Sequence, residues 1–314
     1  MDSVKYVIGI DSGGTNFRVE ACDLTGKQLA FYIGVPANHY YVDEEELSRR
    51  VNANIDACLA TFGGKRDDAA CLVCGTTGLD SPEDEALLNR FYGSLPGFHC
   101  PVKVINDAEL AHYTVTGGFG VLVISGTGSI AFGRNKAGQT RRTGGWLFTI
   151  QGDEGSGTWI SRMALRYVGR WLDGAVPESP LVTMVCEHLH IKDRNDLNTI
   201  AARSGTPPWY TPPLAEIVNK AADAGDAAAA DILQQAADLV AQLVEDTAAA
   251  LDMPRTEPNF IIGVWGSAIL KSPRMLKAFR ARLARTCPQA EICLPQRSAT
   301  EGAVAMALDL LQGA

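Results

Sequence analysis

The chain has 314 residues and a net charge of −8, with 46% hydrophobic and 20% charged residues. This length suits two packed domains, and the apolar content excludes a disordered chain. The acidic balance, without a basic stripe, argues against nucleic acid as a partner. With no signal-peptide pattern and no apolar run of about 18 residues, we expect a cytoplasmic protein with no membrane partner.

The first predicted element is a β-hairpin with an unusually small-residue turn. The apolar run 6–10 ends in Asp11-Ser12-Gly13-Gly14-Thr15, and a second strand-like run covers 17–21. The glycines permit positive φ and close approach of a ligand to the backbone, and successive turn N–H groups can hold an anion. Asp11 could hold Mg²⁺ through its waters. An ordinary tight turn is the alternative interpretation.

A strand that runs directly into a helix presents the next candidate. Residues 102–105 are β-branched or long and predict a strand, and the helix-forming run 107–111 follows. Asp107 lies where the two meet. It is a favoured helix N-cap residue, and it could equally be the general base that takes a proton from a substrate hydroxyl in phosphoryl transfer. The two roles are compatible.

A second glycine-rich hairpin follows. The apolar run 121–124 leads into Ser125-Gly126-Thr127-Gly128-Ser129, and strand character resumes over 130–133. No Gly-Lys-Ser/Thr opens a helix here, so this is no P-loop. Nor does the first hairpin match the dinucleotide fingerprint, because no helix follows it. The two hairpins predict two similar domains that grip one polyphosphate from opposite sides.

The eight cysteines are expected to stay as thiols. Cys71 and Cys74 have metal-like spacing, but they lie in an apolar strand-like run, where positions three apart point to opposite faces. No second CxxC or His pair follows, so we expect no zinc site. The remaining cysteines are interpreted as small core residues.

The overall pattern is α/β. We expect an N-terminal domain over 1–116 and a C-terminal domain over 117–298, with the last helix, 299–311, packing back onto the first domain. Strands are expected near 5–11, 16–22, 28–34, 69–75, 102–106 and 260–264, and helices near 44–62, 156–171, 181–190, 212–224, 226–251 and 273–286. The segment 204–213, with its proline pairs, predicts a surface loop.

Eight motifs, in order over nearly the whole chain, resemble the sugar-kinase, Hsp70 and actin superfamily. Within it the chain is similar to the BadF/BadG/BcrA/BcrD-type ATPase group that contains N-acetylglucosamine kinase. The matching motifs are DSGGTNFR (11–18), ANHYYV (37–42), INDAELA (105–111), ISGTGSIAFG (124–133), GGW (144–146), GDEGSGTWIS (152–161), GVWGSAILKS (263–272) and PQRSATEGAVAMAL (295–308).

The resemblance implies a two-domain actin-like (ribonuclease H-like) ATPase fold with a central cleft. It implies ATP and Mg²⁺ as cofactors, and closure of the domains around the reactants. Asp107 would be the catalytic base and Asp11 would position Mg²⁺. The resemblance further implies ATP contacts from Gly13, Gly14, Thr15, Asn16, Gly126, Thr127, Gly128, Ser129, Gly266, Ser267 and Lys271.

The same resemblance implies a sugar site at Asn38, Asp107, Gly145, Trp146 and Asp153. Three of these residues have ordinary alternatives: Asn38 as a turn residue, Trp146 as a core residue, and Asp153 as an acid favoured at a helix start. Relatives usually have a glycine after the tryptophan and the acid six residues after it. Here Leu147 replaces that glycine and the acid lies seven residues on, which leaves the identity of the sugar open.

The expected reaction is therefore transfer of the ATP γ-phosphoryl group to O6 of an amino sugar, N-acetylglucosamine first and glucosamine or N-acetylmuramic acid as alternatives. The alternative class is an ATPase that activates a 2-hydroxyacyl-CoA dehydratase-type enzyme. Such activators share an iron–sulfur cluster between subunits, and the cysteines here offer no matching context. A nucleotide-sensing regulator is a third class, which Asp107 disfavours. Oligomeric state stays open, with a homodimer as one option.

Overall fold

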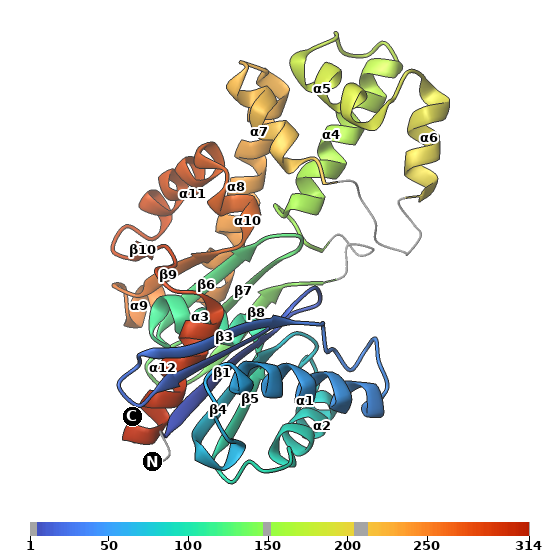
Figure 1. Cartoon of the computed structure of the whole chain (residues 1–314). Helices are drawn as coiled ribbons and strands as arrows, with labels where there is room; N and C mark the ends of the chain where they lie inside the picture. Colours follow the sequence, from blue (N-terminus) through green and yellow to red (C-terminus); the bar gives the residue numbers. More distant parts are fainter. Residues whose placement is uncertain (1–4, 147–151, 204–212, 314) are drawn as a thin grey trace. The chain divides into compact units, whose positions relative to one another are not determined.

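The computed structural model describes residues 5–146, 152–203 and 213–313. Contacts divide the chain into two compact units (Figure 1). Unit 1 consists of Met1–Gly118 together with Pro295–Ala314, and unit 2 of Phe119–Leu294. The boundaries expected from sequence, after 116 and after 298, lie close to these.

Unit 1 is built on a five-stranded mixed sheet in the order β3-β2-β1-β4-β5. The first three strands form an antiparallel meander, β4 pairs parallel to β1, and β5 pairs parallel to β4. Its elements are β1 (Tyr6–Ser12), β2 (Phe17–Asp23), β3 (Gln28–Gly34), α1 (Glu44–Ala60), a 3₁₀ turn (Arg66–Asp68), β4 (Ala69–Thr76), α2 (Pro82–Gly93), β5 (Val102–Asn106), α3 (Asp107–Thr116) and α12 (Ala299–Gln312).

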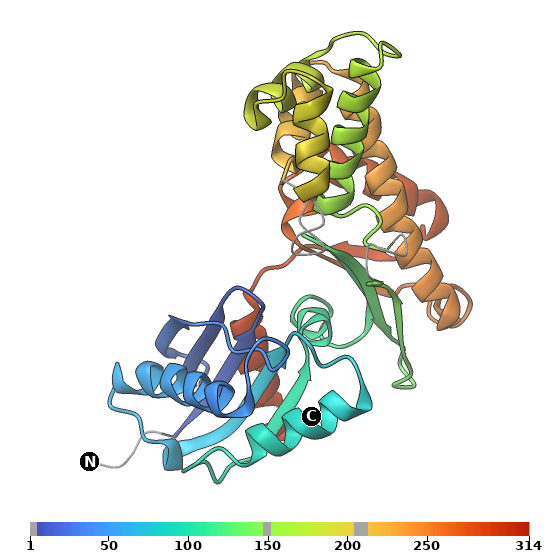
Figure 2. The same cartoon turned by 90° about the vertical axis from the view of Figure 1, so that its right-hand side faces the viewer.

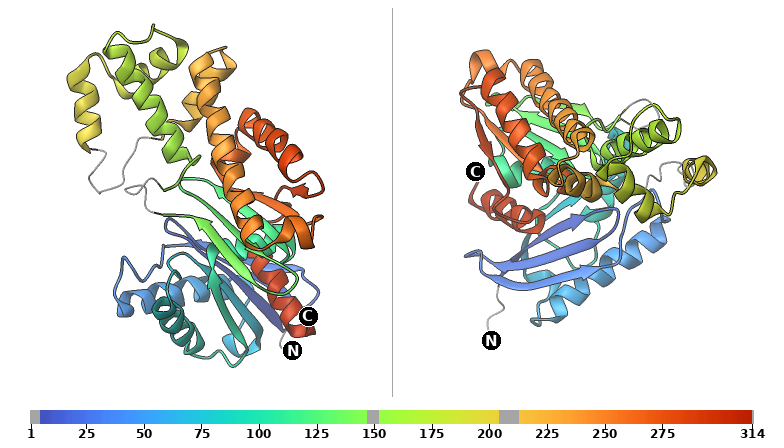
Figure 3. Two further views of the ribbon diagram at one scale, coloured as in Figure 1. Left: turned by 180° about the vertical axis from the view of Figure 1, so that it is seen from behind. Right: turned by 90° about the horizontal axis from the view of Figure 1, so that it is seen from above.

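Helices cover both faces of this sheet. One apolar core lies between the sheet and α1 and α2, and the other between the sheet and α3 and α12. In both views of Figure 3 the C-terminal helix α12, in red, lies against the blue strands. Cys74 belongs to the first core and Cys71 to the second, which confirms that they point to opposite faces.

Unit 2 repeats the same topology, with its sheet in the order β10-β9-β6-β7-β8. Again three strands form an antiparallel meander; the later strand β9 pairs parallel to β6, and β10 pairs parallel to β9. The elements are β6 (Gly120–Ser125), β7 (Ser129–Arg134), β8 (Thr140–Gly144), α4 (Gly157–Leu172), α5 (Pro180–Leu189), α6 (Arg194–Arg203), α7 (Ala215–Asp223), α8 (Ala227–Ala250), α9 (Met253–Thr256), β9 (Ile261–Trp265), α10 (Ser267–Leu270), α11 (Pro273–Thr286) and β10 (Glu291–Cys293).

The alanine-rich helix α8 is the centre of the unit 2 core. Its small residues let it pack closely on β6, β7 and β8 and against α4, α7 and α11 (Figure 2). Ten of its side chains are buried, from Ala229 to Ala248, so it is the packed structural helix that the sequence predicted. In the described part of the chain, no helix has both the length and the apolarity needed to cross a membrane.

Several elements were not anticipated from the sequence. Helix α2 is the clearest case, because its start signals are all present. Ser81 caps the helix and forms a reciprocal capping box with Asp84, and Pro82 takes the first helical position. Helix α6 and the short strands β8 and β10 were also missed. Strands as short as β10 gain their stability from a neighbouring strand rather than from their own residues.

A close approach between the backbones of β1 and α12 predicts a stability effect in unit 1. A Cβ at Gly9 of β1 would lie 2.5 Å from the Thr300 carbonyl oxygen and 2.8 Å from the Val304 nitrogen, both backbone atoms of α12. Gly9→Ala should therefore force α12 away from the sheet and reduce the free energy of unfolding by about 1–3 kcal/mol. Urea unfolding followed by circular dichroism measures this. The control is Gly93→Ala, where a Cβ would meet nothing within 4 Å; equal losses in both variants would contradict the packing argument.

Candidate active site

The three parallel strands of unit 1, β1, β4 and β5, end at the same position in the sheet register. The register pairs Ser12 of β1 with Thr76 of β4, and Thr76 with Asn106 of β5. The next residue after each strand is Gly13, Thr77 or Asp107. Ligands in open α/β sheets bind at the carboxyl ends of parallel strands, so this edge is the candidate site of unit 1.

Asp107 occupies the first turn of α3 without serving as its cap. The cap is Asn106, whose side chain accepts a hydrogen bond from the Ala108 N–H at 2.8 Å. Asp107 Oδ1 accepts from the same N–H at 2.8 Å, and Oδ2 accepts from the Thr77 hydroxyl at 2.9 Å. Burial raises the pKa of Asp107, and these two hydrogen bonds only partly oppose that effect. A carboxylate with a raised pKa is suited to act as a base.

Asp11 is held by an ion pair across the hairpin. It lies directly opposite Arg18 in the β1–β2 register, and Arg18 Nη1 donates to Asp11 Oδ2 at 2.8 Å. Burial raises the pKa of Asp11, and Arg18 offsets part of this rise. Among the described residues Asp11 Oδ1 has no recorded hydrogen bond, so this oxygen can accept one from a bound water.

The turn after β1 exposes its backbone, though not by the conformation we expected. Gly13 N–H donates to the Asn16 carbonyl at 2.9 Å, and Gly14 and Thr15 are exposed. Neither Gly13 nor Gly14 adopts positive φ. The space beside Gly14 is open, since a Cβ there would meet no atom within 4 Å, so a ligand can approach the backbone at this point. Asn16 donates to the Thr15 hydroxyl at 3.2 Å.

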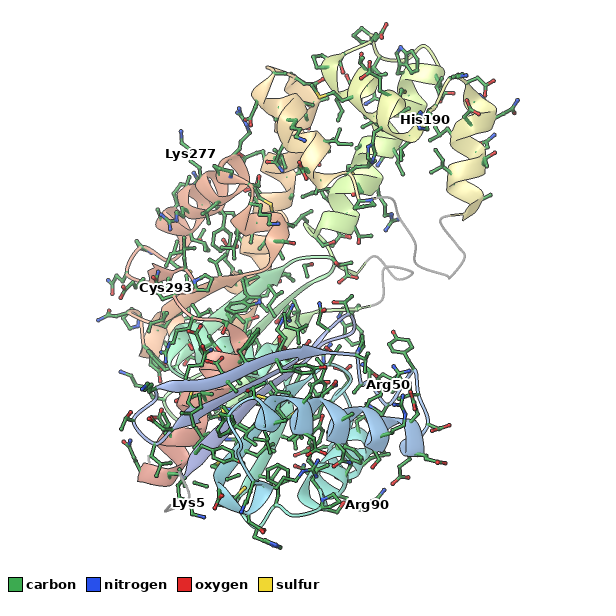
Figure 4. The ribbon with its side chains drawn as sticks, viewed as in Figure 1. Lys5, Arg50, Arg90, His190, Lys277 and Cys293 are labelled. Carbon is green, nitrogen blue, oxygen red and sulfur yellow. The ribbon has the colours of Figure 1, made fainter. Side chains whose placement is uncertain are left out.

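Asn38 is only 4% exposed and is used by its own loop. Its side chain accepts from the Tyr40 N–H at 2.8 Å and donates to the Thr77 carbonyl at 3.3 Å. The chain leading to Asn38 is anchored by Arg50 of α1, labelled in Figure 4, which donates to the Pro36 carbonyl at 2.8 Å. The loop is therefore a rigid neighbour of Thr77.

A polar cluster holds the far side of this loop to α2. Asp84 accepts from the Tyr40 hydroxyl at 2.8 Å and lies 3.0 Å from His39 Nε2. Burial acts to raise the pKa of Asp84, but the hydrogen bonds from Ser81, His39 and Tyr40 together bring it well below its usual range. The carboxylate therefore stays charged and keeps the loop in place.

In unit 2 the second glycine-rich turn is tied to the start of α4. Gly128 leaves room for the Asp153 carboxylate, because a Cβ would lie 2.5 Å from Asp153 Oδ1. The ties are Ser129 N–H to Asp153 Oδ1 (2.9 Å), Ser129 hydroxyl to the Glu154 carbonyl (2.7 Å), Ser125 hydroxyl to the Gly155 carbonyl (2.9 Å), Gly157 N–H to the Gly126 carbonyl (2.8 Å) and Thr158 N–H to the Thr127 carbonyl (3.3 Å).

A cavity of about 430 Å³ opens beside this turn, within the size range of small-molecule sites. Four of the predicted ATP-binding residues line it, namely Gly126, Thr127, Ser267 and Lys271. Gly266 adjoins it with φ +100°, and a Cβ there would lie 2.4 Å from the Ser125 carbonyl oxygen. Only glycine fits that position. The cavity also has a wall that the sequence did not reveal, formed by residues of α4 and α7 that include Thr158, Ser161, Glu216 and Asn219.

The remaining predicted sugar residues lie in unit 2. Trp146 is 66% exposed, which excludes the core role considered for it. Gly145 donates its N–H to the Ser129 carbonyl at 2.9 Å. Asp153 has φ +62° and a pKa that burial raises and the Ser129 N–H lowers. Leu147, the departure from the motif, lies outside the described residues.

The predicted residues thus fall into two groups. Asp11, the Gly13–Asn16 turn, Asn38 and Asp107 gather at one edge of the unit 1 sheet. The second turn, Gly145, Asp153, Gly266, Ser267 and Lys271 belong to unit 2. Sequence reasoning missed Arg18 and Thr77, the partners of the two carboxylates. The signals for Arg18 were its place in the DSGGTNFR motif and its position opposite Asp11 in the hairpin, and the signal for Thr77 was its position at the end of a parallel strand.

Comparisons with known proteins identify the family of the chain. The BadF/BadG/BcrA/BcrD ATPase family matches residues 8–308. An N-acetylmuramic acid/N-acetylglucosamine kinase of Clostridium acetobutylicum is 32% identical over 97% of this chain and 98% of its own length. An N-acetyl-D-glucosamine kinase of Dictyostelium discoideum is 28% identical over 98% of this chain and 99% of its own.

Solved structures share the fold. A Chromobacterium violaceum protein has a TM-score of 0.74 at 23% identity, covering 97% of this chain and 99% of its own. A ROK family glucokinase of Streptomyces griseus has a TM-score of 0.55 at 17% identity, covering 98% of this chain and 100% of its own. The actin-like α/β fold predicted from the sequence is confirmed. The chain belongs to the BadF/BadG/BcrA/BcrD ATPase family.

Proposed function

We propose that this protein is an ATP-dependent amino-sugar kinase that transfers the γ-phosphoryl group to the 6-hydroxyl of a hexosamine, N-acetylglucosamine first. The observation that carries the proposal is Asp107: a carboxylate of raised pKa at the carboxyl ends of the parallel strands, with β4 between its strand β5 and the strand β1 that leads into the small-residue turn. Full-length similarity to two kinases of N-acetylated amino sugars supports it.

In this proposal Asp107 removes the proton of the acceptor hydroxyl as the oxygen attacks phosphorus. The Gly13–Asn16 turn, with exposed Gly14 and Thr15, receives phosphate oxygens on its backbone N–H groups. Unit 2 supplies the second phosphate turn, Gly126–Ser129, and the cavity beside it takes the adenosine, bordered by Gly266, Ser267 and Lys271.

The unit 1 edge also fits a magnesium ion. Mg²⁺ is usually held by one or two carboxylates, several waters and substrate phosphates rather than by a protein cage. Asp11 offers such a carboxylate, with Arg18 on one oxygen and the other able to accept from a metal-bound water. When bound with ATP, the ion would neutralise charge on the β- and γ-phosphates.

The acceptor sugar is assigned to Asn38, Gly145, Trp146 and Asp153. The exposed Trp146 ring offers an apolar face for a sugar ring. Among the described residues Asp153 has one carboxylate oxygen with no recorded partner, and that oxygen can accept from a sugar hydroxyl. Because one relative is named for N-acetylmuramic acid as well, that sugar and glucosamine remain the alternatives.

The first test is the loss of the base. Asp107→Asn should lower kcat by about 10²–10⁴-fold. In the unaltered protein kcat/KM for the sugar should fall as the pH drops through the raised pKa of Asp107, because only the ionised form accepts the proton. A coupled ADP-release assay over N-acetylglucosamine, glucosamine and N-acetylmuramic acid measures both effects.

Two controls make this test decisive. Glu109→Gln removes the same charge from the same turn of α3 and should retain most of the turnover. ATP hydrolysis without sugar should be slow and rise sharply when the preferred amino sugar is added. Rapid hydrolysis that no sugar changes would contradict the kinase and favour an ATPase that drives a partner protein.

The second test separates the structural and sugar roles of Asp153. Asp153→Ala leaves the Ser129 N–H unpaired and should reduce the free energy of unfolding by about 1–3 kcal/mol. Asp153→Asn keeps an oxygen acceptor and tolerates positive φ, so stability should stay near that of the unaltered protein while KM for the sugar rises. Unfolding in urea and sugar kinetics are compared for both. An unchanged sugar KM in Asp153→Asn would restrict Asp153 to a structural role.

A further inference from the structure

Thr77 forms hydrogen bonds to three separate segments of unit 1. It follows β4, the strand between β1 and β5, and its N–H donates to the Ser12 carbonyl at 3.0 Å. Its carbonyl accepts from Asn38 Nδ2 at 3.3 Å, and its hydroxyl donates to Asp107 Oδ2 at 2.9 Å. One residue thus contacts the end of β1, the Asn38 loop and the candidate base.

The surroundings hold Thr77 in place. Next to it, Gly78 has φ +91°, and a Cβ there would lie 3.0 Å from ring carbons of both His39 and Tyr40. The His39 and Tyr40 side chains are fixed in turn by Asp84. Threonine is also stiff at χ1 because it is branched at Cβ. The hydroxyl therefore has little freedom to turn away from Asp107.

The contact with Asp107 completes a two-point hold on that carboxylate. Oδ1 accepts from the Ala108 N–H and Oδ2 from the Thr77 hydroxyl, at 2.8 and 2.9 Å. A carboxylate oxygen has two acceptor sites, so each oxygen can still accept a further bond. The two hydrogen bonds fix the side-chain rotamer of Asp107 and leave acceptor sites on its oxygens for a substrate proton.

We propose that Thr77 is a positioning residue, whose hydroxyl holds Asp107 in the orientation for proton transfer and whose peptide joins that carboxylate to the Asn38 loop. The inference rests on the proposed kinase function and adds a residue to its site. Misplacing a reacting group by about 1 Å can cost about 100-fold in rate, so loss of the fixed Asp107 rotamer should lower kcat.

The charges around Asp107 determine the direction of the pH effect. Asp11 on β1 and Asp80 after β4 disfavour its ionised form together with burial, while the Thr77 hydroxyl and the Ala108 N–H favour it. Arg18 on β2 pairs with Asp11. Removing the hydroxyl should therefore raise the pKa of Asp107 further and move the acid limb of kcat/KM to higher pH.

The experiment compares Thr77→Val, which removes the hydroxyl at nearly constant shape, with Thr77→Ser, which keeps it. Thr77→Val should lower kcat by about 10- to 100-fold, leave KM for ATP near the unaltered value and shift the acid limb upward. Thr77→Ser should restore most of kcat. Thr114→Val is the matched control, because within the described residues its hydroxyl donates to the Leu110 carbonyl of the same helix α3 and to no other group.

Thermal unfolding of each variant separates lost folding from lost positioning. Loss of kcat in Thr77→Val with an unchanged acid limb, or an equal loss in Thr114→Val, would overturn the inference. A direct titration of the Asp107 carboxyl carbon by NMR in magnesium-free buffer, assigned with Asp107→Asn, needs no turnover. An upward shift of the Asp107 titration in Thr77→Val supports the contact between the two side chains, whether or not any sugar is phosphorylated. Absence of sugar phosphorylation would reject only the kinase function. An unchanged titration would reject the role of Thr77.

Discussion

The register of three parallel strands is the constraint on which the unit 1 site depends. Because β1, β4 and β5 end level, Gly13, Thr77 and Asp107 follow at one edge although they are far apart in sequence. Packing maintains this register from both faces, with α1 and α2 on one side and α3 and α12 on the other. Gly9 lets α12 approach β1 at backbone distance, so the C-terminal helix is part of what holds the site.

Two partly buried carboxylates near one another disfavour each other's charged form, and each has a specific partner that stabilises it. Burial raises the pKa of both Asp11 and Asp107, and Asp11 adds to the rise at Asp107. The Arg18 guanidinium stabilises the charged form of Asp11 by an ion pair. The Thr77 hydroxyl stabilises the charged form of Asp107 by a hydrogen bond and brings no opposite charge. The difference suits the proposed roles, since a metal-orienting carboxylate should stay charged and a base should be able to take a proton.

The two units share one sheet topology but carry different sites. Both units place a small-residue turn after the first strand of an antiparallel meander, and both add two parallel strands. In unit 1 the carboxyl ends of the parallel strands carry the two carboxylates, Asp11 and Asp107. Unit 2 ties its turn to the start of α4 and opens a cavity beside it, whose wall comes from the helices that follow. Residues such as Gly128 and Gly266 are small because backbone or side-chain atoms occupy the space a Cβ would need.

The sequence by itself determined the two hairpins, the strand-to-helix junction at Asp107, the packed helix α8 and the family, because these follow from local periodicity and from motifs a few residues long. It also indicated Asp11, but it did not indicate the partners of the carboxylates, nor that Asn106 rather than Asp107 caps α3. Only the tertiary structure decided those. The bond from Thr77 to Asp107 and the wall that α7 adds to the cavity depend on strand register and helix packing between distant segments. No local pattern encodes such distances, because they are set by how whole elements fit together.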